Sequence, residues 1–305
     1  MAIVEISPER AATFAASETE LSILIVTWNS QRWIERCLRS IPAACAGLSY
    51  EIVVYDNSSH DRTLQLLGGE VRLIASQHND GFAGAINRAL GTARGPFVLL
   101  LNPDCELGPR SLTLLIEFLR SHHEVAAAAP LLEDERGESQ REFQIRRFPT
   151  LTTFAVDVLA IDKLWPSNPV TASYRCRDLD LTQPRRVDQP AAAALLIRRE
   201  IFDDIGPFDE QFSPAWFEDV DYCRRLSQAG KEIWIVPAAQ ARHFGGASLE
   251  HVPFAQFIDF WYGNMWRYAQ KWLTPGEREA LRWIVITGMI LRLGAAALGI
   301  AHPEV

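Results

Sequence analysis

The sequence lacks both glycine-rich fingerprints that most often mark a nucleotide-binding fold. No G-x-G-x-x-G follows the first apolar run, and no G-x-x-x-x-G-K-[ST] is present. In both motifs, backbone N–H groups at a helix N-terminus bind phosphate. Their absence argues against a nicotinamide dinucleotide fold and against a P-loop nucleotide hydrolase.

The sequence also has no cysteine pairs and no excess of basic residues, and we expect no export signal in residues 1–20. The five cysteines are scattered and odd in number, with no C-x-x-C pair, which argues against a disulfide framework and a zinc site. A net charge of −8 argues against binding to a nucleic-acid backbone. Residues 1–20 hold several acids and no apolar run of signal-peptide length, so we expect a flexible tail and a cytoplasmic protein.

The alternation of apolar runs with helical patterns predicts an α/β fold. Strand-like runs at 21–27, 51–55, 71–75 and 97–101 are separated by segments with helical spacing. Such an order favours a mostly parallel, Rossmann-like central sheet with helices on both faces. A hydrophobic fraction of 48% is sufficient for a sizeable core.

Beyond residue 130 the pattern becomes irregular. Between 133 and 190, charges, prolines and isolated aromatic residues predict a hairpin and a long loop over the site. Further strands are expected at 191–197 and at 233–236, where Pro237 would end the second. A helix is expected between these strands, at 217–229.

The C-terminal region, 251–305, is predicted to be helical. An aromatic-rich helix spans 254–272, and a second helix begins at Pro275 and is apolar over about 17 residues, a marginal length for a membrane span. Five basic residues and two acids lie between Arg267 and Arg292, which favours an interfacial helix on an anionic leaflet. The alternative is a helix that packs on the domain or in a dimer interface, and periodicity cannot separate the two.

The segment 96–107 places a carboxylate at the end of an apolar run. A run without alternation is typical of a strand buried on both faces, and Pro103 must end it because proline cannot donate to the ladder. Asn102 and Asp104 then lie at the carboxyl edge of the sheet, where open α/β sheets bind ligands. A carboxylate there suits Mg²⁺ or Mn²⁺ shared with a diphosphate. The alternative is an Asn-Pro turn in which Asp104 caps the next helix.

A second group of acids follows Pro214, in the stretch 217–225. Glu218 and Asp221 are three residues apart and are expected to share a helix face, whereas Asp219 points elsewhere. Acids among aromatic side chains predict a partly buried carboxylate with a raised pKa, which suits a general base. Acids are also common in the first turn of a solvated helix, where the macrodipole attracts them.

Three further polar positions have two interpretations each. His243 precedes paired glycines and suits a metal or phosphate ligand, but a lone histidine is also often structural. Asp56 ends the second strand and suits either a nucleobase or ribose contact or an Asx-turn. The turn at Asn79, just before Gly81, is ambiguous in the same way.

Taken together, these motifs resemble glycosyltransferase family 2, the inverting GT-A glycosyltransferases, and most of all its bacterial rhamnosyltransferase branch. One such motif would be weak, whereas an ordered set is specific. The matching segments follow the family's order: Val26–Ser30, Val54–Asp61, Asn79–Asn87, Leu99–Asp104, Gly206–Glu210, Phe217–Asp221 and His243–Gly246.

The resemblance implies a domain organisation. A GT-A domain would cover 21–250, with a nucleotide-sugar-binding half at 21–130 and an acceptor and catalytic half at 131–250. The tail at 1–20 precedes it, and the helical extension at 251–305 follows it.

The resemblance also assigns roles to individual residues. Asp219 would be the catalytic base, with Glu218 and Asp221 in support. Asp104 and His243 would hold a divalent metal, Mg²⁺ or Mn²⁺, on the donor diphosphate. The residues expected at the nucleotide and its sugar are Thr27, Asn29, Asp56, Asn79, Gly81, Asn87 and Asn102.

Two departures from the family pattern affect these expectations. Asn102 stands where the family has the first acid of Asp-x-Asp, which gives a neutral ligand and predicts weaker metal binding. The three alanines at 191–193 stand where the family often has a Gly-Ala pair before the acceptor side.

The implied activity is inverting transfer of a sugar, L-rhamnose from dTDP-L-rhamnose, to a hydroxyl of a glycan or lipid-linked glycan. The alternatives are a UDP-hexose donor and a non-catalytic nucleotide-sugar-binding protein. A sugar nucleotidyltransferase would need a basic, glycine-rich loop after the first strand, which 28–31 does not supply. The implied location is the cytoplasm at the inner face of the cell membrane, with a membrane surface and a homodimer as further partners.

Overall fold

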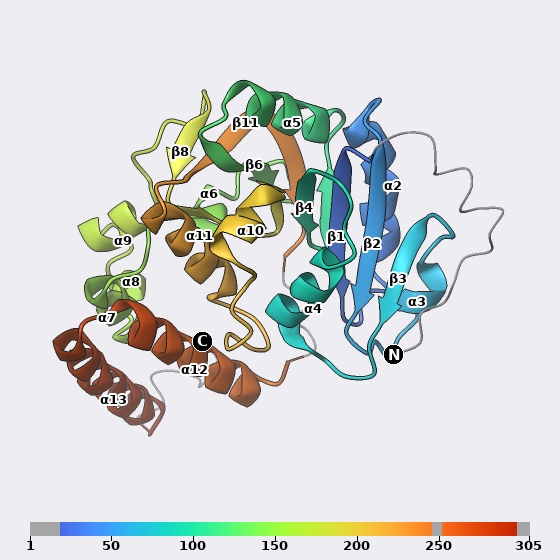
Figure 1. Ribbon diagram of the computed structural model, residues 1–305. Coiled ribbons are helices and arrows are strands. Elements are labelled where there is room, and N and C mark those ends of the chain that lie inside the picture. Colours follow the sequence, from blue (N-terminus) through green and yellow to red (C-terminus); the bar gives the residue numbers. More distant parts are fainter. Residues whose placement is uncertain (1–18, 246–251, 298–305) are drawn as a thin grey trace.

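A computed structural model describes residues 19–245 and 252–297 of the protein. Its centre is a nine-stranded sheet in the order β3-β2-β1-β4-β10-β6-β11-β5, with β8 also paired to β11 (Figure 1). Most of the predicted tail at 1–20 lies outside the described residues, as does Gly246 of the predicted glycine pair.

The N-terminal part of the sheet consists of four parallel strands in the order β3-β2-β1-β4. In β1 the consecutive residues Ile23, Leu24 and Ile25 are fully buried, because both faces of the strand are covered. The predicted parallel sheet with both faces buried is therefore confirmed. The elements are β1 (Leu21–Thr27), α2 (Ile34–Cys45), β2 (Tyr50–Asp56), α3 (Thr63–Leu66), β3 (Val71–Ala75), α4 (Gly81–Leu90) and β4 (Phe97–Leu101).

The second part of the sheet is mixed. β10 is antiparallel to both β4 and β6, whereas β6 and β11 are parallel to each other. Six of the nine strands thus run in one direction, and β5, β8 and β10 oppose them. The elements are β5 (Cys105–Leu107), α5 (Ser111–Ser121), β6 (Val125–Glu133), β8 (Arg185–Val187), β10 (Ala194–Arg198), α10 (Glu200–Ile205), α11 (Glu218–Gln228) and β11 (Glu232–His243).

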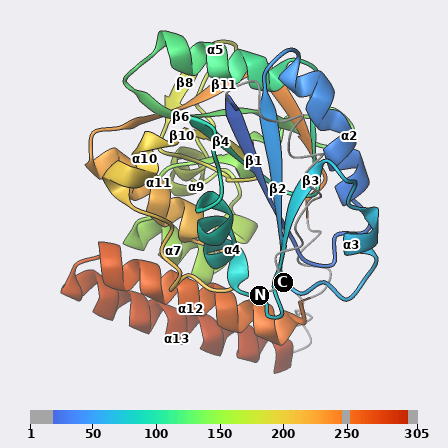
Figure 2. The same cartoon turned by 45° about the vertical axis from the view of Figure 1, so that its right-hand side comes forward.

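Helices cover both faces of the sheet, as the sequence predicts. On one face α2 and α5 pack their apolar sides, including Ile34 and Leu115, against odd-numbered residues of β1 and β4. On the other face α4, α10 and α11 pack side chains such as Ile86 and Tyr222 against the even-numbered ones (Figure 2). Each face of the sheet therefore has its own apolar core. A ligand site is then expected at the edge of the sheet, where the strands end.

The segment 133–190 is not the predicted hairpin and long loop. It forms several short elements between the sheet and the C-terminal helices. Short helices carry too little local pattern to be recognised, because tertiary contacts rather than periodicity hold them. The elements are α6 (Arg141–Gln144), β7 (Ile145–Arg146), α7 (Leu151–Val158), α8 (Ile161–Leu164), α9 (Pro169–Tyr174) and β9 (Gln189–Pro190).

The C-terminal helices α12 (Phe254–Trp272) and α13 (Pro275–Ala297) lie together beside α7 (Figures 1 and 2). A third apolar cluster joins Tyr268 of α12 and Leu281 of α13 to Phe217 ahead of α11. One face of this helix pair therefore packs on the domain. Among the described helices, none combines the length and apolar character needed to cross a bilayer.

Candidate active site

A cleft of about 1000 Å³ opens where the carboxyl ends of β1, β2 and β4 face α11 and α12. Asp104 lines it from the loop after β4, and Asp219 lines it from the first turn of α11. These two carboxylates, 115 positions apart in the sequence, therefore share one cavity. Ligand binding at this edge is the general rule for open α/β sheets.

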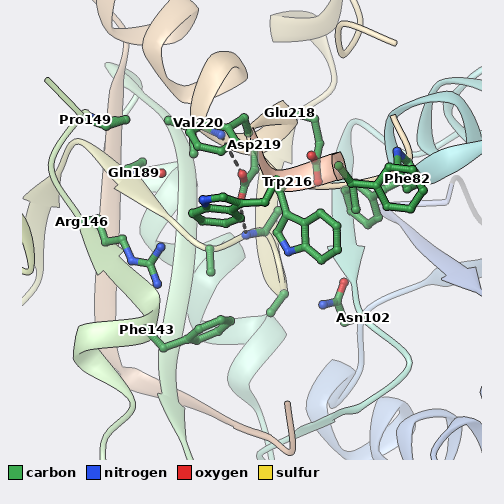
Figure 3. A pocket seen from close by; sticks show the side chains of 18 of the residues that line it. Phe82, Asn102, Phe143, Arg146, Pro149, Gln189, Trp216, Glu218, Asp219 and Val220 are labelled. Atoms are coloured by element: carbon green, nitrogen blue, oxygen red, sulfur yellow. Dashed lines mark hydrogen bonds between the residues drawn. The ribbon is translucent and has the colours of Figure 1, made fainter. Parts of the chain in front are cut away.

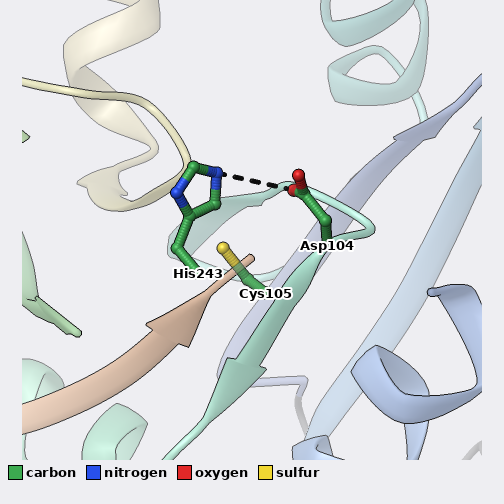
Figure 4. A group of neighbouring side chains, drawn as sticks. All are labelled: Asp104, Cys105 and His243. Atoms are coloured by element: carbon green, nitrogen blue, oxygen red, sulfur yellow. Dashed lines mark ion pairs between the residues drawn. The ribbon is translucent and has the colours of Figure 1, made fainter. Parts of the chain in front are cut away.

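Asp104 and His243 meet because β5 and β11 are antiparallel neighbours. His243 is the register partner of Cys105, so the end of β11 lies beside the turn after β4. The His243 Nε2 atom lies 3.6 Å from Asp104 Oδ1 (Figure 4). Both side chains are buried, at 5% and 6% exposure, and both line the cleft.

The other ring nitrogen of His243 is held by a glutamine. His243 Nδ1 lies 3.0 Å from Gln140 Oε1, and Gln140 Nε2 donates to the His243 carbonyl at 2.8 Å. Phe143 stacks on the imidazole ring with centroids 4.9 Å apart. Burial lowers the pKa of His243, although the nearby Asp104 carboxylate opposes the shift. A neutral imidazole oriented through its second nitrogen is the form that binds a metal ion.

Cys105 is the third potential ligand in this group. Its Sγ lies within 4.8 Å of the ligand atoms of Asp104 and His243. Burial raises the pKa of the Cys105 thiol well above its usual value, and the thiol donates to the Ala193 carbonyl at 3.3 Å. A thiol that keeps its proton is a poor metal ligand. The donor set that fits a hard divalent cation is therefore the carboxylate and the imidazole.

The loop before α11 turns two acids into the cleft. Trp216 and Phe217 both have positive φ angles, 75° and 73°, which bulky residues rarely adopt. Contacts on two sides hold this loop: Asn264 donates to the Ala215 carbonyl at 2.7 Å, and the Phe82 N–H donates to the Pro214 carbonyl at 2.7 Å. Strain that the surroundings maintain is a feature of functional sites.

Asp219 is positioned by main-chain donors. The Val220 N–H donates to its Oδ1 at 2.8 Å, and the Ala192 N–H donates to its Oδ2 at 3.3 Å (Figure 3). Burial raises the pKa of Asp219, while these two N–H groups and the Arg146 guanidinium act in the opposite direction. The result is a carboxylate with more proton affinity than a solvated aspartate, as a general base needs.

Glu218 is the second acid on the cleft wall. Its side chain is 7% exposed, and its Oε2 atom has no hydrogen-bond partner among the described residues. Burial, and then the neighbouring Asp219 charge, raise the pKa of Glu218 well above its ordinary value. Burial therefore favours the protonated, neutral form of Glu218.

Asp221 does not share a face with Glu218, contrary to the expectation from their spacing. Its side chain is fully buried outside the cleft lining, where Lys271 Nζ and Trp272 Nε1 donate to it at 2.9 and 2.8 Å. Arg225 also donates to it from the next turn, at 3.1 Å. The Asp221 side chain points toward α12 because Lys271 and Trp272 donate to it there. Asp221 anchors the C-terminal helices, and a supporting role for it in catalysis stays a prediction.

Three residues predicted to hold the nucleotide instead connect the loops after β1 and β2. Thr27 Oγ1 donates to Asp56 Oδ1 at 2.7 Å, and Ser59 donates to both Asp56 oxygens. Asn29 Oδ1 accepts from the His60 N–H at 2.8 Å. In the described structure Thr27, Asn29 and Asp56 are not part of the cleft lining, whereas Trp28 and Asn57 beside them are. Direct contact of these three with a nucleotide stays a prediction.

The four remaining predicted nucleotide-site residues divide into two pairs. Asn79 and Asn102 line the cleft. Gly81, with φ of 72°, packs so closely that a Cβ would meet the Pro214 carbonyl oxygen at 2.8 Å. Asn87 exchanges hydrogen bonds with the Phe208 backbone, as donor and as acceptor, both at 2.9 Å. Gly81 and Asn87 thus join α4 to the segment 208–214, and in the described structure they do not line the cleft.

Sequence reasoning missed several residues at the cleft. Phe143 and Arg146 line the cleft from short elements whose sequence has no periodic signal, and Gln140, which contacts His243, directly precedes one of them. In the sequence, Trp216 is one of the aromatic residues next to the acids. In the structure it lines the cleft (Figure 3). Arg267 of α12 also lines the cleft. The sequence predicts a separate helical extension at 251–305 and gives no indication of this contribution.

Comparison with known proteins identifies the class of this site. The fold and a single cleft lined by a carboxylate–imidazole pair and by two acids of α11 define a GT-A glycosyltransferase. The chain belongs to glycosyltransferase family 2, whose family model, "Glycosyl transferase family 2", matches residues 22–206.

The chain is similar to two bacterial rhamnosyltransferases. It is 28% identical to N-acetylglucosaminyl-diphospho-decaprenol L-rhamnosyltransferase of Mycobacterium tuberculosis, over 89% of this chain and 94% of that protein. It is also 28% identical to Rhamnosyltransferase WbbL of Escherichia coli K12, over 73% and 82%.

Two solved structures share the fold at low identity. One is S. aureus TarS 1-349 in complex with UDP-GlcNAc, with 19% identity, a TM-score of 0.51 and coverage of 93% of this chain and 77% of that one. The other is GalNAc-T7 with UDP, GalNAc and Mn²⁺, with 17% identity, a TM-score of 0.53 and coverage of 75% and 44%. The glycosyltransferase fold expected from the sequence is confirmed.

Proposed function

We propose that this glycosyltransferase moves L-rhamnose, with inversion, from dTDP-L-rhamnose to a hydroxyl of a lipid-linked diphosphate glycan. The observation that carries the proposal is the single cleft shared by Asp104 and Asp219. The names of two relatives support the sugar, and the name of one supports an N-acetylglucosaminyl-diphospho-lipid acceptor.

In this mechanism Asp219 takes the proton from the acceptor hydroxyl as its oxygen attacks the anomeric carbon. The attack comes from the face opposite the leaving diphosphate, which inverts the anomeric configuration. The two main-chain N–H groups fix the direction of the Asp219 carboxylate, so that it needs no reorganisation in the transition state. Trp216 and Phe82 on the cleft wall exclude water from the reacting sugar.

A divalent metal also fits this cleft. Asp104 and His243 would hold it, with Gln140 orienting the imidazole. A bound Mg²⁺ or Mn²⁺ supplies neutralisation of the charge that develops on the departing diphosphate. Asn102, on the same rim, adds an amide oxygen rather than a second carboxylate.

Binding of nucleotide sugars tests the proposal directly. We expect dTDP-L-rhamnose with Mn²⁺ to raise the thermal midpoint more than UDP-glucose, UDP-N-acetylglucosamine or either component alone, because a ligand of the folded state stabilises it. The measurement is a thermal-shift screen of these nucleotide sugars with and without Mn²⁺. A larger shift with a UDP-sugar would reassign the donor, and no shift with any nucleotide sugar would contradict the function.

We also propose that α13 rests on the inner leaflet of the cell membrane and brings the cleft to its lipid-linked acceptor. Leu281 and Gly288 face the domain, and a Cβ at Gly288 would meet the Val158 carbonyl oxygen at 2.7 Å. The opposite side of the helix exposes a row of large apolar side chains: Trp283 (61%), Ile286 (36%), Met289 (46%) and Ile290 (63%). A tightly seated helix with an exposed apolar face and an excess of basic residues suits an anionic lipid surface.

Vesicle flotation of the full chain tests this placement. Trp283→Ser with Ile290→Ser is expected to weaken binding to phosphatidylglycerol-containing vesicles by about 10-fold or more, since each side chain loses its apolar burial. Leu64→Ser, at an exposed apolar residue of α3, is the matched control and should bind as the unmodified chain does. Equal binding by all three proteins would show that α13 does not contact lipid.

A further inference from the structure

The three acids at the start of α11 are satisfied to very different degrees. Asp221 accepts from Arg225, Lys271 and Trp272, and Asp219 accepts from two main-chain N–H groups. Glu218 is as buried as a core residue, yet its Oε2 has no partner among the described residues. No ion pair between described residues includes it either. A buried polar atom without a partner is costly and calls for a specific explanation.

The position of Glu218 is fixed rather than accidental. It is the first residue of α11, directly after two residues with positive φ, and the loop before it is bonded to both Asn264 and Phe82. In Figure 3 its carboxyl group lies beside Asp219, on the side of Phe82 and Asn102. The fold therefore holds an unsatisfied carboxyl group on the cleft wall, next to the proposed base.

We propose that Glu218 is a specificity-determining residue whose carboxyl group forms a hydrogen bond with a ring hydroxyl of a sugar bound in the cleft. This inference rests on the proposed function, which places a donor sugar and an acceptor sugar at Asp219. A protonated carboxylic acid can donate to a hydroxyl and also accept from it, so the carboxyl group gains a partner when substrate binds. The raised pKa of Glu218 agrees with this role, because an uncharged acid neither competes with Asp219 for the proton nor binds the cation.

This role predicts opposite effects on stability and activity. Replacing Glu218 with methionine removes the orphaned oxygen and keeps a side chain of similar length, so the thermal midpoint of the substrate-free protein is expected to rise. The kcat/KM for glycosyl transfer is expected to fall by about 10- to 100-fold, because the sugar hydroxyl loses its partner. Glu218→Gln, which still donates and accepts, should keep kcat/KM within about fivefold of the unmodified enzyme.

The measurements are thermal unfolding without substrate and steady-state kinetics with donor and acceptor varied in turn. A KM rise confined to the donor assigns the hydroxyl to the transferred sugar, and one confined to the acceptor assigns it to the receiving sugar. Glu117→Met, on the exposed side of α5, is the matched control. A lower thermal midpoint in Glu218→Met, or equal kcat/KM in that variant and the unmodified enzyme, would overturn the inference. Failure of the proposed function shows itself differently, as no turnover by the unmodified enzyme.

Discussion

Replacing Asp219 with asparagine is expected to lower kcat for glycosyl transfer by about 10³- to 10⁴-fold, because the amide cannot take the acceptor proton. Donor affinity should stay near normal, because the cation-binding pair is Asp104 and His243, and Asp219 is not among the potential cation ligands. The measurement is transfer rate together with donor binding by the same preparation. Asp203→Asn, at an exposed aspartate of α10, is the matched control.

The pH dependence of the unmodified enzyme gives an independent view of the same residue. Asp219 must be deprotonated to act as a base, and burial raises its pKa above the usual aspartate value. Activity should therefore fall as the pH is lowered through that raised pKa, which places the acid limb of kcat/KM above pH 3.8. Retained turnover in Asp219→Asn would remove Asp219 from the role of base.

Replacing Asp104 with alanine is expected to abolish the effect of Mn²⁺ on donor binding and to lower kcat/KM by about 10³-fold. The physical reason is that without Asp104 the neutral His243 imidazole is the only ligand left of the pair. The cation then has no carboxylate to balance its charge. The measurement is donor affinity across a Mn²⁺ titration.

Glu106→Gln gives the matched control for this substitution. Glu106 is two residues further along and pairs with Arg36, and it is not part of the described cleft lining. This variant should keep the metal response of the unmodified chain. A Mn²⁺ response in Asp104→Ala equal to that of Glu106→Gln would place the cation elsewhere.

The central strands could be predicted because burial on both faces requires apolar residues, and a continuous apolar run is visible in the sequence. The run at 21–27 matches β1 residue for residue, since a strand covered on both faces tolerates only apolar side chains over most of its length. The helix at 254–272 is also confirmed as α12. Here the aromatic residues that made the segment conspicuous are the ones that pack in the third apolar cluster.

Two prolines lie inside their elements rather than at the ends, and for Pro237 this corrects the expectation from the sequence. Pro42 lies inside α2, which continues to Cys45 because Ile41, Ala44 and Cys45 are all buried against the sheet. Pro237 lies inside β11, which passes it through a register shift between Val236 and Gln240. Proline removes one donor, and a tertiary contact or a bulge can compensate for that loss. The continuation of β11 is what carries His243 to Asp104.

The site could be predicted only in part. Asp104 follows a strand and Asp219 lies in the first turn of a helix, and their flanking residues point to both, because strand ends and helix starts leave local signals. The pairing of β5 with β11, and hence the meeting of His243 with Asp104, depends on contacts between segments more than 130 residues apart. Gln140 directly precedes α6 and Arg146 lies in β7, two short elements whose positions are set by their neighbours. The sequence alone carries no signal for them.

The most direct test of this account is the anomeric configuration of the sugar after transfer. The full chain would be incubated with dTDP-L-rhamnose, Mn²⁺ and a lipid-linked N-acetylglucosaminyl diphosphate, and the new linkage would be analysed by NMR. The account predicts a rhamnosylated product whose configuration is opposite to that of the donor. A product that retains the donor configuration would contradict a single displacement assisted by Asp219.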